Sequence, residues 1–195
     1  GGKAPAIVLP DVNIESAVNQ LVAGALPMAG QQCTAIARIL VENSRFEEVT
    51  QRLVSALSAI KVGPGADPVS QMGPLIDIVN RDRIVKLIDT AKSQVKVHLE
   101  GRVPSGVLSK GAFVTPTLVE VEDLNSPFIQ DEIFGPFVVI ERFNSYAEAI
   151  ERANATRFGL AASVWGENGE LARKLSSKLK SGTVWLNCHN RLFAE

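Results

Sequence analysis

The sequence predicts an α/β fold in three layers, α/β/α, with helices on both faces of an open, mostly parallel sheet. Short apolar runs rich in β-branched residues alternate along the chain with segments whose apolar residues recur at helical spacing. Several of these runs are apolar throughout, as expected for strands that helices cover on both faces. Because no repeat or interdomain linker interrupts the pattern, we expect one domain over residues 1–195.

Seven runs are expected to form the strands of this sheet, at residues 6–9, 36–41, 95–99, 117–121, 138–140, 161–165 and 183–186. Side chains that can accept backbone N–H groups stand ahead of most helical segments, where they would act as N-caps. A Ser followed three residues later by Glu is the signature of a capping box. The N-cap candidates are Asn13, Ser44 with Glu47, Ser145 with Glu148, and Asn168.

Five helices are expected, each with an apolar stripe that would face the sheet. Gly182 is expected to end the last of them. The loop over residues 63–74 is rich in turn residues but joins elements of the same domain. In chain order the stripes are Ile14, Val18, Leu21, Val22 and Ala25; Phe46, Val49, Leu53 and Leu57; Ile84, Leu87, Ile88 and Ala91; Ala149, Ile150 and Ala153; and Leu171, Leu175 and Leu179.

Composition excludes several classes of function. With 195 residues and 46% hydrophobic content, the chain can bury one substantial core. Its formal net charge is -1 and its charges are interspersed, so no basic surface for nucleic acid is expected. No apolar stretch reaches the roughly 20 residues that a membrane-spanning helix needs. Two cysteines cannot form a disulfide framework, so we expect a cytoplasmic protein, and we identify no metal site.

Cys33 is the first candidate for chemistry. It follows a helical pattern that ends near Pro27 and Gly30, and it precedes a strand-like run. At such a junction backbone N–H groups can lack partners, and they can stabilise a thiolate or an oxyanion. A lone Cys in an apolar chain is nevertheless more often a small buried side chain. The residues alone therefore favour a structural role for Cys33.

Two further segments contain candidate site residues. In the segment 131–136, Glu132 and Phe134 can lie along one edge of a loop, although a solvated acid beside a core Phe is the commoner arrangement. The expected strand 183–186 delivers Asn187 and His189 to its carboxyl end, where ligands of α/β sheets collect. A loop amide with satisfied hydrogen bonds is the simpler role for Asn187.

Six collinear motifs give the chain a resemblance to a known family over essentially its whole length. They are Gly1-Gly2-Lys3-Ala4-Pro5, Gly30-Gln31-Gln32-Cys33, Gln71-Met72-Gly73-Pro74-Leu75-Ile76, Glu132-Ile133-Phe134-Gly135-Pro136, Phe158-Gly159-Leu160-Ala161 and Gly182-Thr183-Val184-Trp185-Leu186-Asn187. In this order and at this spacing the motifs resemble those of the aldehyde dehydrogenase superfamily. The motif at residues 1–5 is similar to the tail of that family's Glu-Leu-Gly-Gly-Lys signature, and the motif at residues 30–33 is similar to its nucleophile motif.

The resemblance implies a function and a set of roles. Cys33 matches the thiol that attacks an aldehyde, giving a thiohemiacetal and then a thioester on the way to a carboxylic acid. The backbone N–H of Cys33 would stabilise the oxyanion. Glu132 matches the carboxylate that holds the nicotinamide ribose of NAD or NADP, and Phe134 matches the aromatic ring against the nicotinamide. Weaker candidates for the substrate pocket are Gln32, Asn187 and His189.

The departures from the family pattern are equally informative. The general base of the family is the Glu of Glu-Leu-Gly-Gly-Lys, and the chain begins after it. The asparagine oxyanion donor and most of the dinucleotide-binding domain precede that point too. The chain ends at Glu195, ahead of a segment that closes the site and assembles oligomers. We therefore expect a catalytic-domain fragment without dehydrogenase turnover or bound cofactor, from a parent that is a homo-oligomer, dimeric or tetrameric.

Two alternatives remain open at this point. One is a cysteine hydrolase or esterase-like domain that uses Cys33 with His189 as its base, because a thiol paired with an imidazole is a recurring nucleophile. The other is a non-catalytic scaffold that retains the fold only. A latent esterase activity is compatible with the dehydrogenase assignment, since acylation of a thiol by an activated ester needs no cofactor.

Overall fold

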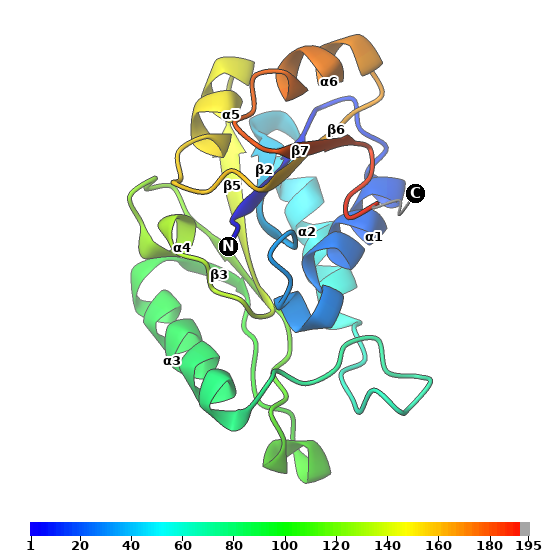
Figure 1. Cartoon of the computed structure of the whole chain (residues 1–195), viewed down its shortest axis with the longest axis vertical. Coiled ribbons are helices and arrows are strands. Elements are labelled where there is room, and N and C mark those ends of the chain that lie inside the picture. The colour runs from blue at the N-terminus through cyan, green and yellow to red at the C-terminus, as the bar shows by residue number, and fades with distance from the viewer. Residues whose placement is uncertain (192–195) are drawn as a thin grey trace.

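The computed structural model describes residues 1–191, which form a seven-stranded sheet between two layers of helices (Figure 1). Glu195, from which a missing C-terminal segment was inferred, lies outside the described residues. The strand order is β3-β4-β5-β2-β1-β6-β7, and all neighbours are parallel except β3 and β4. The predicted three-layer, mostly parallel α/β fold is thus confirmed. The strands are β1 (Ala4–Val8), β2 (Ile36–Glu42), β3 (Lys96–Leu99), β4 (Thr117–Glu120), β5 (Phe137–Phe143), β6 (Ala161–Trp165) and β7 (Thr183–Leu186).

The helices divide between the two faces of the sheet, as the alternation of strand side chains requires. Ala6 and Val8 share one core cluster with α1, α2 and α3, whereas Ile7 and Leu9 share the other with α5 and α6. Figure 1 shows α5 and α6 on one side of the sheet and α1 and α2 on the other. The helices are α1 (Ile14–Ala25), α2 (Phe46–Ser58), α3 (Ile78–Gln94), α4 (Pro127–Gln130), α5 (Tyr146–Ala153) and α6 (Gly169–Ser176), with short 3₁₀ turns η1 (Pro27–Gly30), η2 (Asn43–Arg45) and η3 (Gly106–Lys110). Within residues 1–191 no helix has the length and apolar character needed to cross a membrane.

Three predicted helix starts are confirmed by side-chain caps. The side chains of Asn13, Ser145 and Asn168 accept the backbone N–H three residues further on, at 3.1, 3.2 and 3.0 Å. The prediction at Ser44 is wrong, because β2 runs on to Glu42 and leaves Ser44 inside η2. The Glu42 carboxylate accepts the Ser44 N–H instead, at 2.9 Å.

The predicted end of the last helix is also wrong. α6 stops at Ser176, six residues before Gly182. Leu179 is still buried, but it belongs to the turn that follows the helix. Gly182 instead precedes β7, where its N–H donates to the carbonyl of Gly159 at 2.9 Å.

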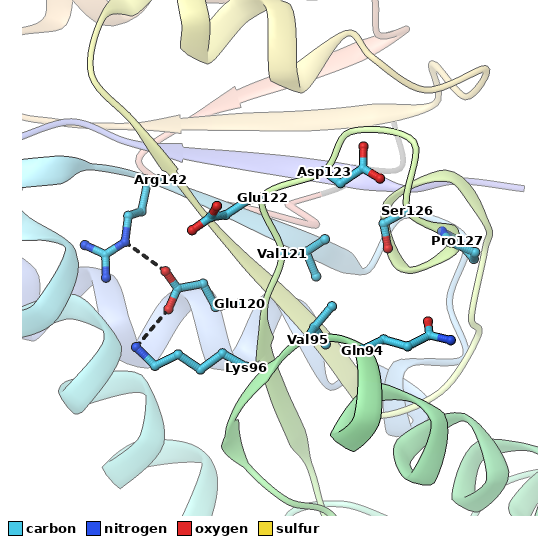
Figure 2. Close-up of a pocket in the computed structure, with 10 residues that line it drawn as sticks. All are labelled: Gln94, Val95, Lys96, Glu120, Val121, Glu122, Asp123, Ser126, Pro127 and Arg142. Atoms are coloured by element: carbon cyan, nitrogen blue, oxygen red, sulfur yellow. Dashed lines mark hydrogen bonds and ion pairs between the residues drawn. The ribbon is translucent and has the colours of Figure 1, made fainter.

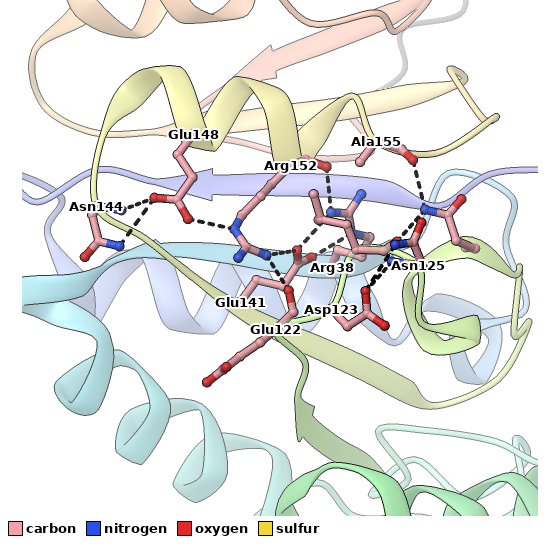
Figure 3. Close-up of polar contacts among 11 residues, drawn as sticks. Arg38, Glu122, Asp123, Asn125, Glu141, Asn144, Glu148, Arg152 and Ala155 are labelled. Carbon is pink, nitrogen blue, oxygen red and sulfur yellow. Dashed lines mark hydrogen bonds and ion pairs between the residues drawn. The ribbon is translucent and has the colours of Figure 1, made fainter.

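Buried charge ties the sheet to α5 (Figure 3). Arg38 on β2 and Glu141 on β5 are both fully buried and form two hydrogen bonds, Nε to Oε1 at 2.7 Å and Nη2 to Oε2 at 3.0 Å. Arg38 Nη2 also donates to the carbonyl of Arg152 at the end of α5, at 2.7 Å. Because an uncompensated buried charge is costly, this bidentate pair holds the two central strands and the helix in one arrangement.

Lys3 lies immediately before β1 with 2% of its surface exposed, and its Nζ has no partner among the described residues. Burial lowers the pKa of Lys3 to about 7, and the nearby positive charge of Arg38 adds to this effect. The folded protein therefore favours the neutral form of the Lys3 amine.

Three glycines bring loops together at the amino ends of the central strands. A Cβ on Gly2 would collide with the carbonyl oxygen of Cys33, and a Cβ on Gly30 would collide with the carbonyl oxygen of Gly135. A Cβ on Gly135 would in turn collide with the side chain of Ile84 on α3. Gly30 also has a φ of +74°, which L side chains rarely adopt. The loops before β1, β2 and β5 therefore approach one another through backbone atoms.

The first prediction concerns Lys3. Its pKa is about 7 in the folded chain against 10.5 for a free lysine, so the unfolded chain binds more protons between these pH values. The free energy of unfolding should therefore rise as the pH increases from 7 towards 10.5. Lys3→Met should flatten this rise and stabilise the protein at neutral pH by about 4 kcal/mol. Urea unfolding at several pH values measures both effects, with the exposed Lys110→Met as control; an unchanged pH slope in Lys3→Met would contradict the prediction.

The second prediction separates backbone strain from close approach. Gly30→Ala should lose more than about 2 kcal/mol of stability, because it combines a left-handed φ with a collision. Gly106→Ala has a similar φ of +67° but open space around its Cβ, and it should lose only about 1 kcal/mol. Gly65→Ala has neither feature and should be nearly neutral. Urea unfolding ranks the three variants, and equal losses for Gly30→Ala and Gly106→Ala would show that the contact with Gly135 is unimportant.

Candidate functional site

Cys33 lies on an exposed turn between η1 and β2, near the middle of the sheet. The turn spans residues 32–35 and is closed by a hydrogen bond from the Ala35 N–H to the Gln32 carbonyl, at 2.9 Å. Within residues 1–191 the backbone N–H of Cys33 has no hydrogen-bond acceptor. The thiol and this N–H are therefore both available to a ligand.

The segment before this turn is strained and held from several sides. Met28 and Ala29 have left-handed φ values of 51° and 58°, and they precede the left-handed Gly30. The Gln31 amide donates to the carbonyl of Met28 at 2.7 Å and accepts the N–H of Ile76 at 2.8 Å. Strained conformations of this kind persist only where the surroundings determine them. The segment 71–76 thus braces the turn that carries Cys33.

Glu132 and Phe134 lie close to this turn. Glu132 Oε1 accepts the N–H of Gly2 at 2.8 Å, and Gly2 is in close contact with the carbonyl of Cys33. Phe134 has a φ of +56° and leaves 41% of its surface exposed. A narrow hollow is lined by Gly2, Gln32, Glu132 and Phe134 together. The structure therefore brings Cys33, Gln32, Glu132 and Phe134 to one place at the amino ends of β1, β2 and β5.

His189 reaches the same turn from the far end of the chain. Its Nε2 lies 2.7 Å from the carbonyl oxygen of Thr34, and its Nδ1 lies 3.0 Å from Ser163 Oγ. The ring is buried, and burial lowers the pKa of His189. Both ring nitrogens are thus engaged by the protein, and His189 contacts the backbone beside Cys33.

Asn187 lies at the opposite end of the strands from Cys33. It follows β7 with a φ of +52°, and its side chain makes two hydrogen bonds of 2.8 Å with the backbone of Gly166, which follows β6. The structure thus places Asn187 at the carboxyl ends of the strands, whereas Cys33 and Glu132 precede β2 and β5. Site residues were expected at the carboxyl end of β7, whereas Cys33 and its neighbours lie at the amino ends of the strands.

A wider hollow lies at the carboxyl ends of β4 and β5, away from the Cys33 turn (Figure 2). Its side chains include Glu120, which pairs with Arg142 at 2.8 Å and with Lys96 at 3.3 Å. Neither Cys nor His lines it. The size of a hollow therefore does not identify the site with thiol chemistry in this protein.

Sequence reasoning missed the contacts that hold the site together. Gly2, Thr34 and Ser163 each contact a site residue that is remote in sequence. Gly2 belongs to the motif at residues 1–5, and that was the only signal for it. No sequence pattern marked Thr34 or Ser163, because their contacts with His189 join residues that are far apart in the chain.

Comparison with known proteins identifies the family to which the chain is similar. The model for "Aldehyde dehydrogenase family" matches residues 1–195. Retinaldehyde dehydrogenase 3 of Homo sapiens is 39% identical over 196 residues, which cover 100% of this chain and 38% of that protein. Betaine aldehyde dehydrogenase, chloroplastic, of Beta vulgaris is 36% identical over 193 residues, covering 99% of this chain and 39% of that protein.

Solved structures give the same result. The crystal structure of betaine aldehyde dehydrogenase from Staphylococcus aureus in complex with NAD+ has a TM-score of 0.95 and 38% identity, and the match covers 100% of this chain and 39% of that one. The chain thus spans about two fifths of the length of these relatives. Because the family model matches every residue and the relatives share this fold and more than a third of the sequence, the chain belongs to the aldehyde dehydrogenase family.

Proposed function

We propose that this chain is the thiol-bearing catalytic domain of an enzyme that oxidises an aldehyde to a carboxylic acid with NAD or NADP. The observation that carries the proposal is Cys33, an exposed thiol on a braced turn whose backbone N–H has no acceptor within residues 1–191. Glu132 and Phe134 line the adjacent hollow. The relatives are named for retinal and for betaine aldehyde, so the proposed substrate class is an aldehyde without further definition.

The residues of this chain suit covalent catalysis. The Cys33 thiolate attacks the aldehyde carbon, a C–S bond forms, and the carbonyl electron pair moves to oxygen to give a thiohemiacetal. The free N–H of Cys33 donates to that oxygen as its negative charge develops. NAD or NADP, which Glu132 and Phe134 would hold, would supply the two-electron oxidation as acceptor of the hydride that leaves the former aldehyde carbon. Cys33 then holds the acyl group as a thioester, which water hydrolyses to release the acid and the thiol.

Two side chains suit the nicotinamide end of the cofactor. The Gly2 N–H fixes the orientation of the Glu132 carboxylate, which can accept hydrogen bonds from ribose hydroxyls. Phe134 presents an open aromatic ring for stacking, since its left-handed backbone leaves the ring at the surface. The S. aureus relative was solved with NAD+, which supports NAD; NADP is the alternative. A homo-oligomeric parent stays a prediction from the resemblance, and a cytoplasmic location stays a prediction from the cysteine count.

The contacts of His189 count against the rival hydrolase. A general base must reach the proton that it removes. In this structure His189 directs one nitrogen at the Thr34 carbonyl and the other at Ser163. The exposed Cys33 likewise counts against a scaffold in which the thiol serves only to fill the core.

The third prediction tests the thiol chemistry directly. The protein should be acetylated by 4-nitrophenyl acetate at Cys33, because thiol acylation needs no cofactor. Cys33→Ser should lower the rate of nitrophenolate release by at least about 100-fold, since a hydroxyl without a base is a poor nucleophile. Cys188→Ser is the matched control, because Cys188 is the only other cysteine, and it should leave the rate unchanged. Mass spectrometry locates the acetyl group, and an acetyl group on Cys188 would contradict the proposal.

A further inference from the structure

We infer that His189 is a positioning residue for the turn that carries Cys33, and that it acts as a neutral imidazole with its proton on Nε2. The inference rests on the proposed function, because it names the side chain that orients the nucleophile turn for that chemistry. It assigns His189 neither contact with the substrate nor a role as a base.

The hydrogen bonds around the ring determine which nitrogen holds the proton. The Thr34 carbonyl oxygen can only accept, so the Nε2–H of His189 donates to it at 2.7 Å. In the neutral ring Nδ1 then accepts, and the Ser163 hydroxyl donates to it at 3.0 Å. Ser163 Oγ itself accepts from the indole N–H of Trp165 at 2.9 Å. A one-directional chain of donors thus runs from the core of β6 through His189 to the nucleophile turn.

The surroundings of the ring keep this arrangement in place. Ser163 and Trp165 are almost completely buried, and the ring of His189 lies tilted against that of Trp185, with 4.7 Å between centroids. Burial lowers the pKa of His189, which favours the neutral ring that the hydrogen bonds require. Protonation would put a second N–H opposite the Ser163 hydroxyl and break the direction of the chain.

The contact matters because it completes the hold on the turn. The Thr34–Ala35 peptide unit is fixed on both sides, by His189 at the carbonyl of Thr34 and by the Gln32 carbonyl at the N–H of Ala35. The carbonyl of Cys33 is in close contact with Gly2. The N–H of Cys33 stays free among these groups, and its direction depends on how the turn is held. Without the imidazole the turn can tilt, and the N–H of Cys33 then no longer points at the developing oxyanion.

Two reactions of the same thiol separate positioning from reactivity. Acylation by 4-nitrophenyl acetate develops negative charge on a carbonyl oxygen, whereas alkylation by iodoacetamide does not. Both rates are measured in a Cys188→Ser background, so that Cys33 is the only thiol. His189→Phe keeps an aromatic ring beside Trp185 but removes both nitrogens. Since loss of an oxyanion donor costs about 100-fold to 1,000-fold, its misorientation in His189→Phe should slow acylation by about 10-fold to 100-fold.

Under the same inference the alkylation rate of Cys33 in His189→Phe should stay within about twofold of the rate with His189 intact, because alkylation forms no oxyanion. His189→Gln offers an amide N–H near the place of Nε2–H, and it should recover part of the lost acylation rate. Unchanged acylation in His189→Phe, or equal losses in both reactions, would overturn the inference and leave the proposed function standing. Failure of Cys33 to be acylated when His189 is intact would instead overturn the proposed function.

A measurement on the unsubstituted protein covers the case in which the variants fail to fold. Ring-nitrogen NMR at neutral pH should show His189 as the neutral Nε2–H tautomer. The protein has only two histidines, so the His98→Gln variant assigns the signals. A signal from the Nδ1–H tautomer, or from the imidazolium ion, would overturn the inference.

Discussion

The site depends on backbone-to-backbone contact at the amino ends of the central strands. Gly2 touches the carbonyl of Cys33 and Gly30 touches the carbonyl of Gly135, and neither position has room for a Cβ. These contacts join the loops before β1, β2 and β5, which are adjacent in the sheet only because the strand order is β5-β2-β1 at its centre. Because these strands are parallel, the loops that precede them lie at the same end of the sheet, and the glycines let these loops meet there.

At this end of the sheet an exposed thiol is carried on a turn that is held in place. The thiol of Cys33 is open to solvent, yet the turn that carries it is held by Ile76, Gly2 and His189, which come from three separate parts of the chain. The buried Arg38–Glu141 pair fixes β2 against β5 below the turn. Preorganised donors are more effective than mobile ones because they need no reorientation as charge develops. The fold thus supplies a fixed support for a reactive group that it leaves uncovered.

Much of the fold could be predicted from local pattern, and less of the site. Periodicity located all seven strands and five helices, and single side chains were enough to predict the caps at Asn13, Ser145 and Asn168. The predictions at Ser44 and Gly182 failed, because strand length and the turn after α6 are set by tertiary packing. Cys33, Glu132 and Phe134 came from motif resemblance. The contact of His189 with Thr34 joins residues far apart in the chain, and no local pattern marks it.

The central claim is that the fold presents Cys33, and not Cys188, as its accessible nucleophile. The most direct test is the rate of modification of each cysteine by iodoacetamide in the folded protein, followed by mass spectrometry. Cys33 is exposed and Cys188 is half-buried beside Trp185, so Cys33 should be modified first and Cys188 more slowly. Protection of Cys33 in the folded protein, or faster modification of Cys188, would contradict the account.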